Sequence, residues 1–262
     1  MAATGDHERY RPARLERGRG CAGATDIGPI RDGNEDAYWI DDGASVLAVA
    51  DGLGGLPAGE VASAVAVGAA RAFLDGAPGE AGASPGADVR ESLVRRAAEA
   101  AHRAVLEVSA ADLRCRGMAT TLLLAVVSPR VATILHVGDS RALLFRGAEV
   151  VATTFDHNAV GDLRRAGVLS AEQARRHPAR NLVREVVGLP EGYQAECQDW
   201  ALEAGDVLVL CTDGVSDALS EDEMARILAA GPDAAASARR LVEAAALEGG
   251  LDNATAVVRH VT

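Results

Sequence analysis

Five short apolar runs constrain the fold of this chain more than any other feature of its sequence. Each has the length of a strand and shows little polar alternation, which is typical of strands covered on both faces. The runs are VLAVA (46–50), TLLLAVV (121–127), VATILHV (131–137), VLVLC (207–211) and ATAVV (254–258). Strands of this kind need covering layers outside their sheets.

Alanine-rich segments can supply those layers. Their composition predicts helices over 60–74, 89–108, 221–230 and 234–247. Ser220 and Glu223 form a capping pattern before the third segment. Strands and helices come in blocks and not in strict alternation, so we expect an α+β fold of mostly antiparallel sheets with helices outside.

The length, composition and net charge of the chain constrain its domain organisation and its partners. The chain has 262 residues, of which 48% are hydrophobic, and this predicts one large domain over 20–262. Residues 1–19 contain five arginines and no apolar periodicity, so we expect a disordered basic arm there. The net charge of −12 argues against nucleic acid as the main partner. No apolar run is long enough for a membrane span or a secretory signal, so we expect a cytoplasmic protein.

Aspartates stand at the ends of the apolar runs. Three runs are followed by Asp51, Asp139 and Asp213, each beside a glycine, and Asp252 comes just before a fourth run. A single such aspartate is best interpreted as turn chemistry. Four carboxylates that converge at adjacent strand ends would repel one another unless a divalent cation neutralised them. Because oxygen ligands select hard cations, the pattern predicts a two-metal hydrolase site for Mg²⁺ or Mn²⁺.

A second indication lies upstream, in the segment RDGNEDA (31–37). Arg31 and Asp36 flank a Gly-Asn turn there. The planar fork of an arginine matches two phosphate oxygens, whereas an isolated surface arginine would be interpreted as part of a salt bridge. Together with the carboxylates, Arg31 favours a phosphate substrate.

These motifs, in this order, resemble those of the metal-dependent serine/threonine protein phosphatases of the PP2C (PPM) family, bacterial type. The resemblance extends from about residue 20 to the C-terminus. It is carried by RDGNEDA (31–37), ADGLGG (50–55), GMATT (117–121), HVGDSRA (136–142), TDGVSD (212–217) and LDNATAVV (251–258). It implies a central antiparallel β-sandwich flanked by helices on both faces.

The resemblance also implies roles for the candidate residues. Asp51 would bridge two divalent cations, Mn²⁺ or Mg²⁺, the Gly52 carbonyl would bind one of them, and Asp213 and Asp252 would hold the other. Asp36 would form a hydrogen bond with metal-bound water, and Arg31 would bind the phosphate of the substrate. The implied reaction is direct attack of a metal-bridging hydroxide on phosphorus, without a phosphoenzyme.

Three more residues have supporting roles in this interpretation. We expect Asp139 to fix a turn beneath the site and Asn253 to orient Asp252. His157 is either a loop anchor or a general acid, and we favour the anchor.

The segment 158–184 resembles the flap that bacterial members place beside the active site. It contains a predicted helix from Ser170 and six arginines, which are Arg164, Arg165, Arg175, Arg176, Arg180 and Arg184. Such a basic patch could steer phosphorylated, acidic peptides to the metals, with Arg164 and Arg165 as candidate contacts. The alternative is a mobile surface helix pair with solvated charges.

Two departures from the family pattern affect the chemistry. Arg116 occupies the position, just before GMATT, where bacterial relatives place an aspartate that helps to hold a third metal. An arginine cannot ligate Mg²⁺, so we expect that site to be lost or weakened, with Arg116 neutralising the phosphate or a carboxylate. The alternative is that Asp112 completes an ordinary third site. The second departure is Leu53, which can transfer no proton, so water or another group must protonate the leaving alkoxide.

The leading hypothesis is a monomeric phosphatase that acts on the protein substrates of a serine/threonine kinase. A low-activity pseudophosphatase that serves as a binding module is a second hypothesis, but the intact Asp36, Asp51, Asp213 and Asp252 argue against it. A phosphatase of anti-anti-sigma factors is a third, and the flap-like insert and the Arg31 motif argue against it.

Overall fold

The apolar runs form inner strands of two antiparallel sheets in the computed structural model, which describes residues 14–18, 20–41, 43, 45–76, 86–248 and 250–262. In spatial order, the first sheet consists of β3 (Asp36–Ile40), β4 (Val46–Asp51), β5 (Leu122–Ser128), β6 (Val131–Val137) and β9 (Glu196–Ala201). The second consists of β1 (Arg14–Gly18), β2 (Cys21–Asp26), β11 (Ala254–His260), β10 (Val207–Cys211), β7 (Arg141–Arg146) and β8 (Glu149–Thr153).

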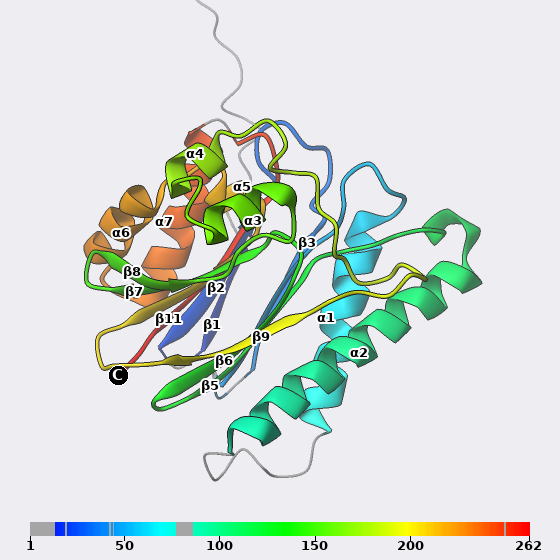
Figure 1. The fold of residues 1–262 in the computed structure, drawn as a ribbon, viewed down its shortest axis with the longest axis horizontal. Coiled ribbons are helices and arrows are strands. Elements are labelled where there is room, and N and C mark those ends of the chain that lie inside the picture. Colours follow the sequence, from blue (N-terminus) through cyan, green and yellow to red (C-terminus); the bar gives the residue numbers. More distant parts are fainter. Residues whose placement is uncertain (1–13, 19, 42, 44, 77–85, 249) are drawn as a thin grey trace, which may run out of the picture.

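Helices cover the outer face of each sheet. The first sheet is covered by α1 (Gly59–Asp75) and α2 (Ala87–Ala111), and the second by α6 (Glu221–Ala230) and α7 (Ala234–Leu247). Figure 1 shows these two helix pairs on opposite sides of the sandwich. The predicted α+β sandwich with helices on both faces is therefore confirmed.

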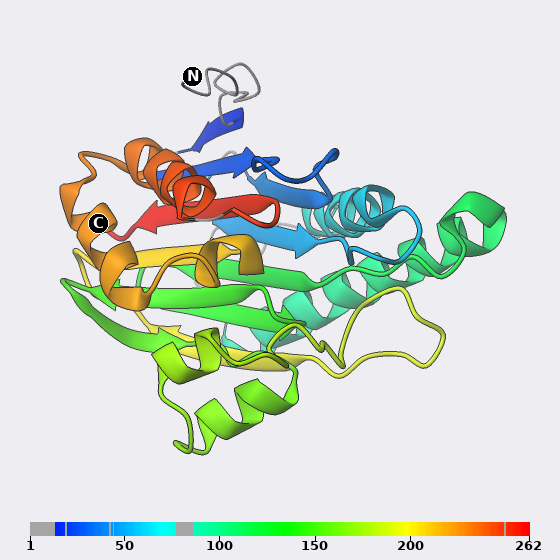
Figure 2. The same cartoon turned by 90° about the horizontal axis from the view of Figure 1, so that it is seen from above.

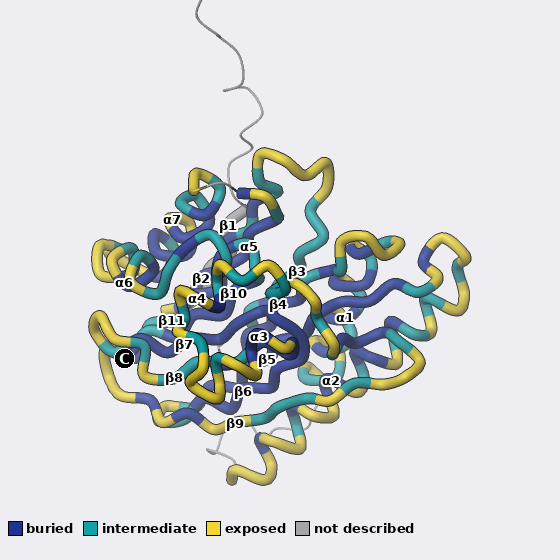
Figure 3. Tube along the Cα trace, turned by 45° about the horizontal axis from the view of Figure 1, so that its top comes forward, coloured by how far each residue is buried: buried dark blue, intermediate teal, exposed yellow. Residues whose placement is uncertain are grey.

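Three apolar layers explain why the strands lack polar alternation. Leu47 and Val49 of β4 face the other sheet, where they join a central cluster that includes Leu210. The intervening Ala48 and Ala50 face α1 and α2 and belong to an outer cluster. A third cluster lies between the second sheet and α6 and α7. The inner strands β4, β5, β6 and β10 are thus apolar on both faces, and they appear mainly buried in Figure 3.

Several helix ends match the sequence closely. Helices α6 and α7 have the predicted bounds, and Ser220 and Glu223 form the expected capping box. Between β8 and β9 lie α3 (Ala159–Arg165) and α4 (Ala171–Arg175), and the helix predicted from Ser170 is confirmed as α4. Figure 2 shows this α3–α4 segment, in light green, at one edge of the sandwich.

The expected disordered arm over 1–19 is wrong for residues 14–18. These form β1, which pairs with β2 from Arg14↔Thr25 to Gly18↔Cys21. The backbone hydrogen bonds of an edge strand need no apolar periodicity, so the sequence pattern did not indicate it. Residues 1–13, 19 and 77–85 lie outside the described residues. Among the described helices, none combines the length and the apolarity needed to cross a bilayer.

Candidate active site

The first two carboxylates lie opposite each other at the end of one ladder. Strands β3 and β4 pair in a register that places Asp36 against Asp51. Directly paired residues of antiparallel strands point to the same face, so the two side chains are neighbours. The backbone of Asp51 is fixed as well, because its carbonyl accepts hydrogen bonds from Thr121 N (2.9 Å) and Thr120 Oγ1 (2.7 Å).

Gly52 directly follows β4, at a position where no side chain fits. A Cβ at Gly52 would lie 2.1 Å from the carbonyl oxygen of Gly59, which starts α1. Its N–H donates to the Glu35 carbonyl at 3.0 Å. A glycine is therefore required at this position by the close approach of α1.

The second sheet brings two further aspartates to the same edge. Asp213 follows β10 and opens the short helix α5 (Asp213–Ser216), and Asp252 precedes β11. Because β10 and β11 are antiparallel neighbours, the end of one lies beside the start of the other. The site is thus assembled from both sheets.

Asn253 ties the loop that carries Arg31 to β11. Its Oδ1 accepts from Glu35 N at 2.7 Å, and its Nδ2 donates to the carbonyls of Ile27 and Gly33 at 2.9 Å each. Its side chain makes these loop contacts, and only its backbone N–H donates to Asp252, at 2.8 Å. The backbone N–H of Asn253 thus orients Asp252, as expected of this residue. The side-chain carboxamide of Asn253 holds the 27–35 loop.

Two threonines hold the carboxylate of Asp36. Its Oδ2 accepts from Thr255 Oγ1 at 2.6 Å and from Thr212 Oγ1 at 2.9 Å. Its Oδ1 is buried and has no hydrogen-bond partner among the described residues. Burial raises the pKa of Asp36 to about 7, against the opposing effect of the two hydroxyls.

Burial and neighbouring carboxylates destabilise the charged forms of Asp51 and Asp213. Burial raises the pKa of Asp51 well above its usual range, and the charge of Asp36 raises it further. Burial likewise raises the pKa of Asp213, followed by the charge of Asp139. The buried Oδ1 of Asp213 has no hydrogen-bond partner among the residues described. Such a cluster favours either protons or a cation.

Arg31 pairs with one of the expected metal ligands. Its Nη2 lies 2.6 Å from Asp252 Oδ2, and the two side chains are 38% and 32% exposed. Within the described residues, no three Asp, Glu, His or Cys side chains are arranged closely enough to hold a metal ion. The oxygen-only donors still fit a hard divalent cation, because two buried carboxylate oxygens lack partners and Asp252 can exchange Arg31 for it.

Asp139 lies in the connection between β6 and β7, and His157 lies in the connection between β8 and α3. Burial raises the pKa of Asp139 to about 7, and its own charge raises the pKa of Asp213. Asp139 therefore lies close enough to act on Asp213 electrostatically, beyond shaping a turn. His157 N–H donates to the Gly138 carbonyl at 2.8 Å and its Nδ1 accepts from Gly138 N at 3.3 Å, which supports the loop anchor.

The sequence left two interpretations of the flap arginines open, a substrate-steering basic patch or solvated charges. In the structure each of the six arginines pairs with a carboxylate. The pairs are Arg164–Glu221, Arg165–Glu196 (2.6 Å), Arg175–Glu172 (3.0 Å), Arg176–Glu172, Arg180–Asp217 (2.6 Å) and Arg184–Asp162 (2.6 Å). Sequence analysis counted the arginines but could not locate the carboxylates, because most partners are distant in sequence. Three of these pairs, those of Arg164, Arg165 and Arg180, attach the flap to the rest of the molecule, and the other three lie within the flap.

Arg116 and Asp112 lie on the turn before GMATT. Arg116 is exposed. Asp112 accepts from Arg114 N (2.9 Å) and pairs with the Arg114 side chain (2.7 Å), and these bonds lower its pKa to about 2. Asp112 thus caps the 3₁₀ turn η2 (Leu113–Cys115), which argues against the alternative in which it completes a third metal site.

Sequence analysis missed the residues that hold the ligands in place. Thr212, Thr255 and Glu35 were not singled out. The available signals were local: Thr212 and Glu35 adjoin predicted site residues, and Thr255 lies two positions after Asn253 in a strand, on the same face.

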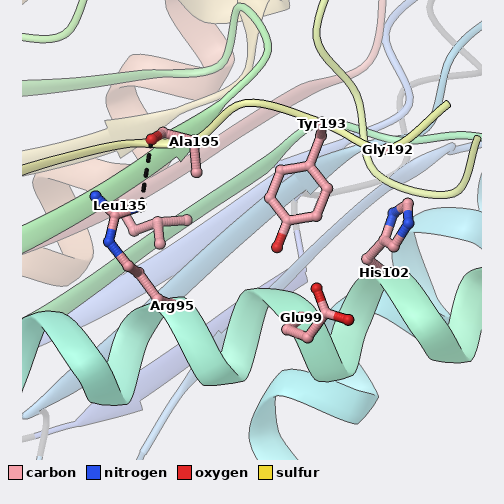
Figure 4. Close-up of a pocket in the computed structure, with 7 residues that line it drawn as sticks. All are labelled: Arg95, Glu99, His102, Leu135, Gly192, Tyr193 and Ala195. Atoms are coloured by element: carbon pink, nitrogen blue, oxygen red, sulfur yellow. Dashed lines mark hydrogen bonds between the residues drawn. The ribbon is translucent and has the colours of Figure 1, made fainter.

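A separate cavity of about 420 Å³ lies between α2 and the segment before β9 (Figure 4). His102 and Tyr193 are in ring contact on its wall, with centroids 5.0 Å apart. His102 Nδ1 also accepts from Gly188 N at 3.1 Å, beside the backbone pair between Val187 and Thr120. The cavity contains none of the predicted site residues.

Comparison with known proteins identifies the family. Residues 30–249 match the family model described as protein phosphatase 2C. The serine/threonine protein phosphatase PstP of Mycobacterium tuberculosis is 38% identical over 244 residues, which are 92% of this chain and 44% of that protein. The chain thus spans less than half the length of PstP. The serine/threonine phosphatase stp of Listeria monocytogenes is 31% identical, over 89% of this chain and 92% of that protein.

Solved structures agree in fold. The crystal structure of M. tuberculosis PstP/Ppp has a TM-score of 0.79 and 34% identity, covering 92% of this chain and 97% of that one. The catalytic domain of PstP in complex with two manganese ions has a TM-score of 0.75 and 32% identity, covering 91% of this chain and 96% of that one. With the sandwich and the carboxylate edge described above, these similarities establish that the chain belongs to the protein phosphatase 2C family.

Proposed function

We propose that this chain is a metal-dependent phosphatase that hydrolyses phosphoserine and phosphothreonine in proteins. The observation that carries the proposal is the meeting of Asp36 and Asp51 from one sheet with Asp213 and Asp252 from the other, beside Arg31. The names of the relatives, which are serine/threonine phosphatases, support the same reaction.

Four groups would hold two divalent cations. They are the carboxylates of Asp51, Asp213 and Asp252 and the carbonyl of Gly52. The two manganese ions in the PstP catalytic domain support this number of cations. When bound, such cations supply a hydroxide nucleophile at neutral pH and neutralise negative charge on the phosphoryl group.

Arg31 binds the phosphate of the substrate. Its side chain is 38% exposed, and its guanidinium group can bind a dianion in place of Asp252. Exchange of these partners releases Asp252 for a cation while Arg31 turns to the phosphate oxygens. The Arg31–Asp252 pair therefore keeps both side chains oriented until substrate and metal arrive.

Asp36 orients water beside the reacting phosphorus. Thr212 and Thr255 occupy its Oδ2, so its unpartnered Oδ1 is the atom that can accept a proton. Burial raises the pKa of Asp36 in the absence of a cation, and cations bound beside it would favour the carboxylate form that accepts a hydrogen bond from water. Leu53 donates no proton, so the leaving alkoxide takes its proton from solvent.

Hydrolysis of a phosphothreonine peptide tests the proposal. We expect turnover with Mn²⁺ or Mg²⁺, none with EDTA, and a loss of at least about 100-fold in kcat/KM for Asp51→Asn, because loss of even an outer-shell partner of a metal site costs 10–100-fold. Activity that survives EDTA or the Asp51→Asn substitution would show that the proposed site is wrong.

We further propose that the third metal site is weakened in this chain because Arg116 stands near it. Arg116→Asp should then change the dependence of activity on Mn²⁺ concentration, since it replaces a positive charge with a ligand. Arg116→Gln separates loss of the charge from gain of the ligand. Unchanged activity and unchanged metal dependence in both variants would contradict this hypothesis.

A further inference from the structure

Three loops meet around Arg31. A Cβ at Gly54 would lie 3.1 Å from Arg31 Nη1, so the 52–56 loop borders the guanidinium group. Arg31 Nη2 contacts Asp252 on the other side, and a Cβ at Gly28 would lie 2.6 Å from the Asp252 carbonyl oxygen. The loops 27–31, 52–56 and 250–252 therefore form one rim around the proposed phosphate-binding arginine.

Each of these loops exposes a large aliphatic side chain. Ile30 is 63% exposed, Leu251 71% and Leu56 38%. Single exposed apolar residues are common on protein surfaces and need no explanation. These three differ because Ile30 adjoins Arg31 in sequence, Leu251 adjoins Asp252, and Leu56 lies two residues from Gly54.

The charges around this rim oppose an acidic substrate. Asp32, Glu35 and Glu60 lie on or beside the same loops and are outside the proposed ligand set, and the negative charge of Glu35 acts on Arg31. The flap arginines are paired with carboxylates and supply no compensating patch. An acidic residue next to the phosphate would be repelled, whereas an aliphatic one would bury apolar area against the rim.

We propose that Ile30, Leu56 and Leu251 determine substrate specificity by accepting an aliphatic side chain next to the phosphorylated serine or threonine. The inference rests on the proposed function, because it needs the phosphate to be bound by Arg31. Adjacent residues of a peptide have Cα atoms 3.8 Å apart, so a residue that flanks the phosphorylated one reaches side chains next to Arg31 and Asp252. The rim thus contacts the residues immediately before and after the phosphorylated serine or threonine.

Matched phosphothreonine peptides with leucine, serine, aspartate or lysine on both sides test the inference. With Mn²⁺, we expect kcat/KM to be at least about fivefold higher for the leucine peptide than for the serine peptide, and lowest for the aspartate peptide. Hydrolysis of p-nitrophenyl phosphate by the same enzyme reports the chemistry without any flanking residue. Equal rates for all peptides, or preference for lysine, would overturn the inference and leave the proposed function intact.

Variants of the rim test whether Ile30 and Leu251 cause the preference for the leucine peptide. In Ile30→Ser/Leu251→Ser the ratio of kcat/KM between the leucine and serine peptides should fall toward one. Val151→Ser, on the distant strand β8 and 45% exposed in the native chain, is the matched control and should keep the ratio. A ratio that persists in the double variant would overturn the assignment of the rim. Absence of hydrolysis of every substrate would overturn the proposed function and this inference with it.

Discussion

The carboxylate of Asp36 is held by threonines from two different places in the second sheet. Thr212 follows β10 and Thr255 lies in β11, and Thr212 Oγ1 also accepts from Thr255 N at 3.0 Å. Thr25 Oγ1 adds a further bond to Thr255 Oγ1 at 2.7 Å. Because these groups belong to rigid strands, they leave Asp36 little rotational freedom.

Replacement of Thr255 by valine should weaken the metal site without unfolding the protein. The substitution keeps the shape of the side chain but removes the 2.6 Å hydrogen bond to Asp36. We expect an affinity for Mn²⁺ lower by about 10-fold, the low end of the effect of residues that orient metal-site groups. Calorimetric titration with Mn²⁺ measures it. Thr153→Val, on β8, is the control, and equal affinities in the two variants would argue against the positioning role.

At the level of single residues, the carboxylates could be predicted and their supports could not. Asp51 and Asp213 each follow an apolar run and adjoin a glycine, so their position at a strand end is a local property. The partners of Asp36 lie 176 and 219 positions away. Thr212 and Thr255 lie near predicted site residues in sequence, but this nearness does not indicate that they contact Asp36. To predict these contacts, one would first need to know how the strands of the two sheets pack together.

The flap is attached to the body of the protein through its arginines. Arg175 donates to the carbonyls of Asp217 and Ala218, and Arg180 pairs with the Asp217 carboxylate at 2.6 Å. Asp217 directly follows α5, whose first residue is Asp213. The flap is therefore linked to a proposed metal ligand through a single short helix.

Arg180→Gln should loosen the flap, because it removes a charged bond to the largely buried Asp217 side chain. We expect faster hydrogen exchange over 159–176 and little change in the strands of either sheet. Hydrogen-exchange mass spectrometry measures this. Arg176→Gln is the control, since its side chain is 75% exposed and pairs only within α4. Identical exchange in both variants would refute the attachment.

Among the elements, buried strands were easier to predict than edge strands. Strands β6 and β10 have the predicted bounds, because an apolar run specifies a strand buried on both faces. Strand β9, with the sequence ECQDWA, lies at a sheet edge and has several exposed residues. Its formation depends on backbone pairing with β6, which the side-chain pattern does not encode.

For the molecule as a whole, a buried histidine pair makes stability depend on pH. His136 and His157 lie with ring centroids 4.4 Å apart. Burial, followed by the charge of His157, lowers the pKa of His136 from 6.5 to about 3. Between these values the unfolded chain binds a proton that the folded chain excludes, so the free energy of unfolding falls as the pH falls.

His136→Gln should therefore make the protein less sensitive to acid. Between about pH 6.5 and pH 3, we expect the slope of the unfolding free energy against pH to decrease by up to about 1.4 kcal/mol per pH unit. Urea denaturation at a series of pH values measures the slope. His177→Gln, in the partly exposed flap, is the control, and a slope unchanged by His136→Gln would contradict the argument.

The division of the site between two sheets has a consequence for assembly. Asp51 comes from the first sheet, while Asp213 and Asp252 flank strands of the second. A cation shared by these groups would act as a removable cross-link between the two halves of the sandwich, and its binding energy would add to the cohesion of the whole chain. A chain whose sheets have not yet docked would lack a complete ligand set, so it could release no phosphate before its folding was finished.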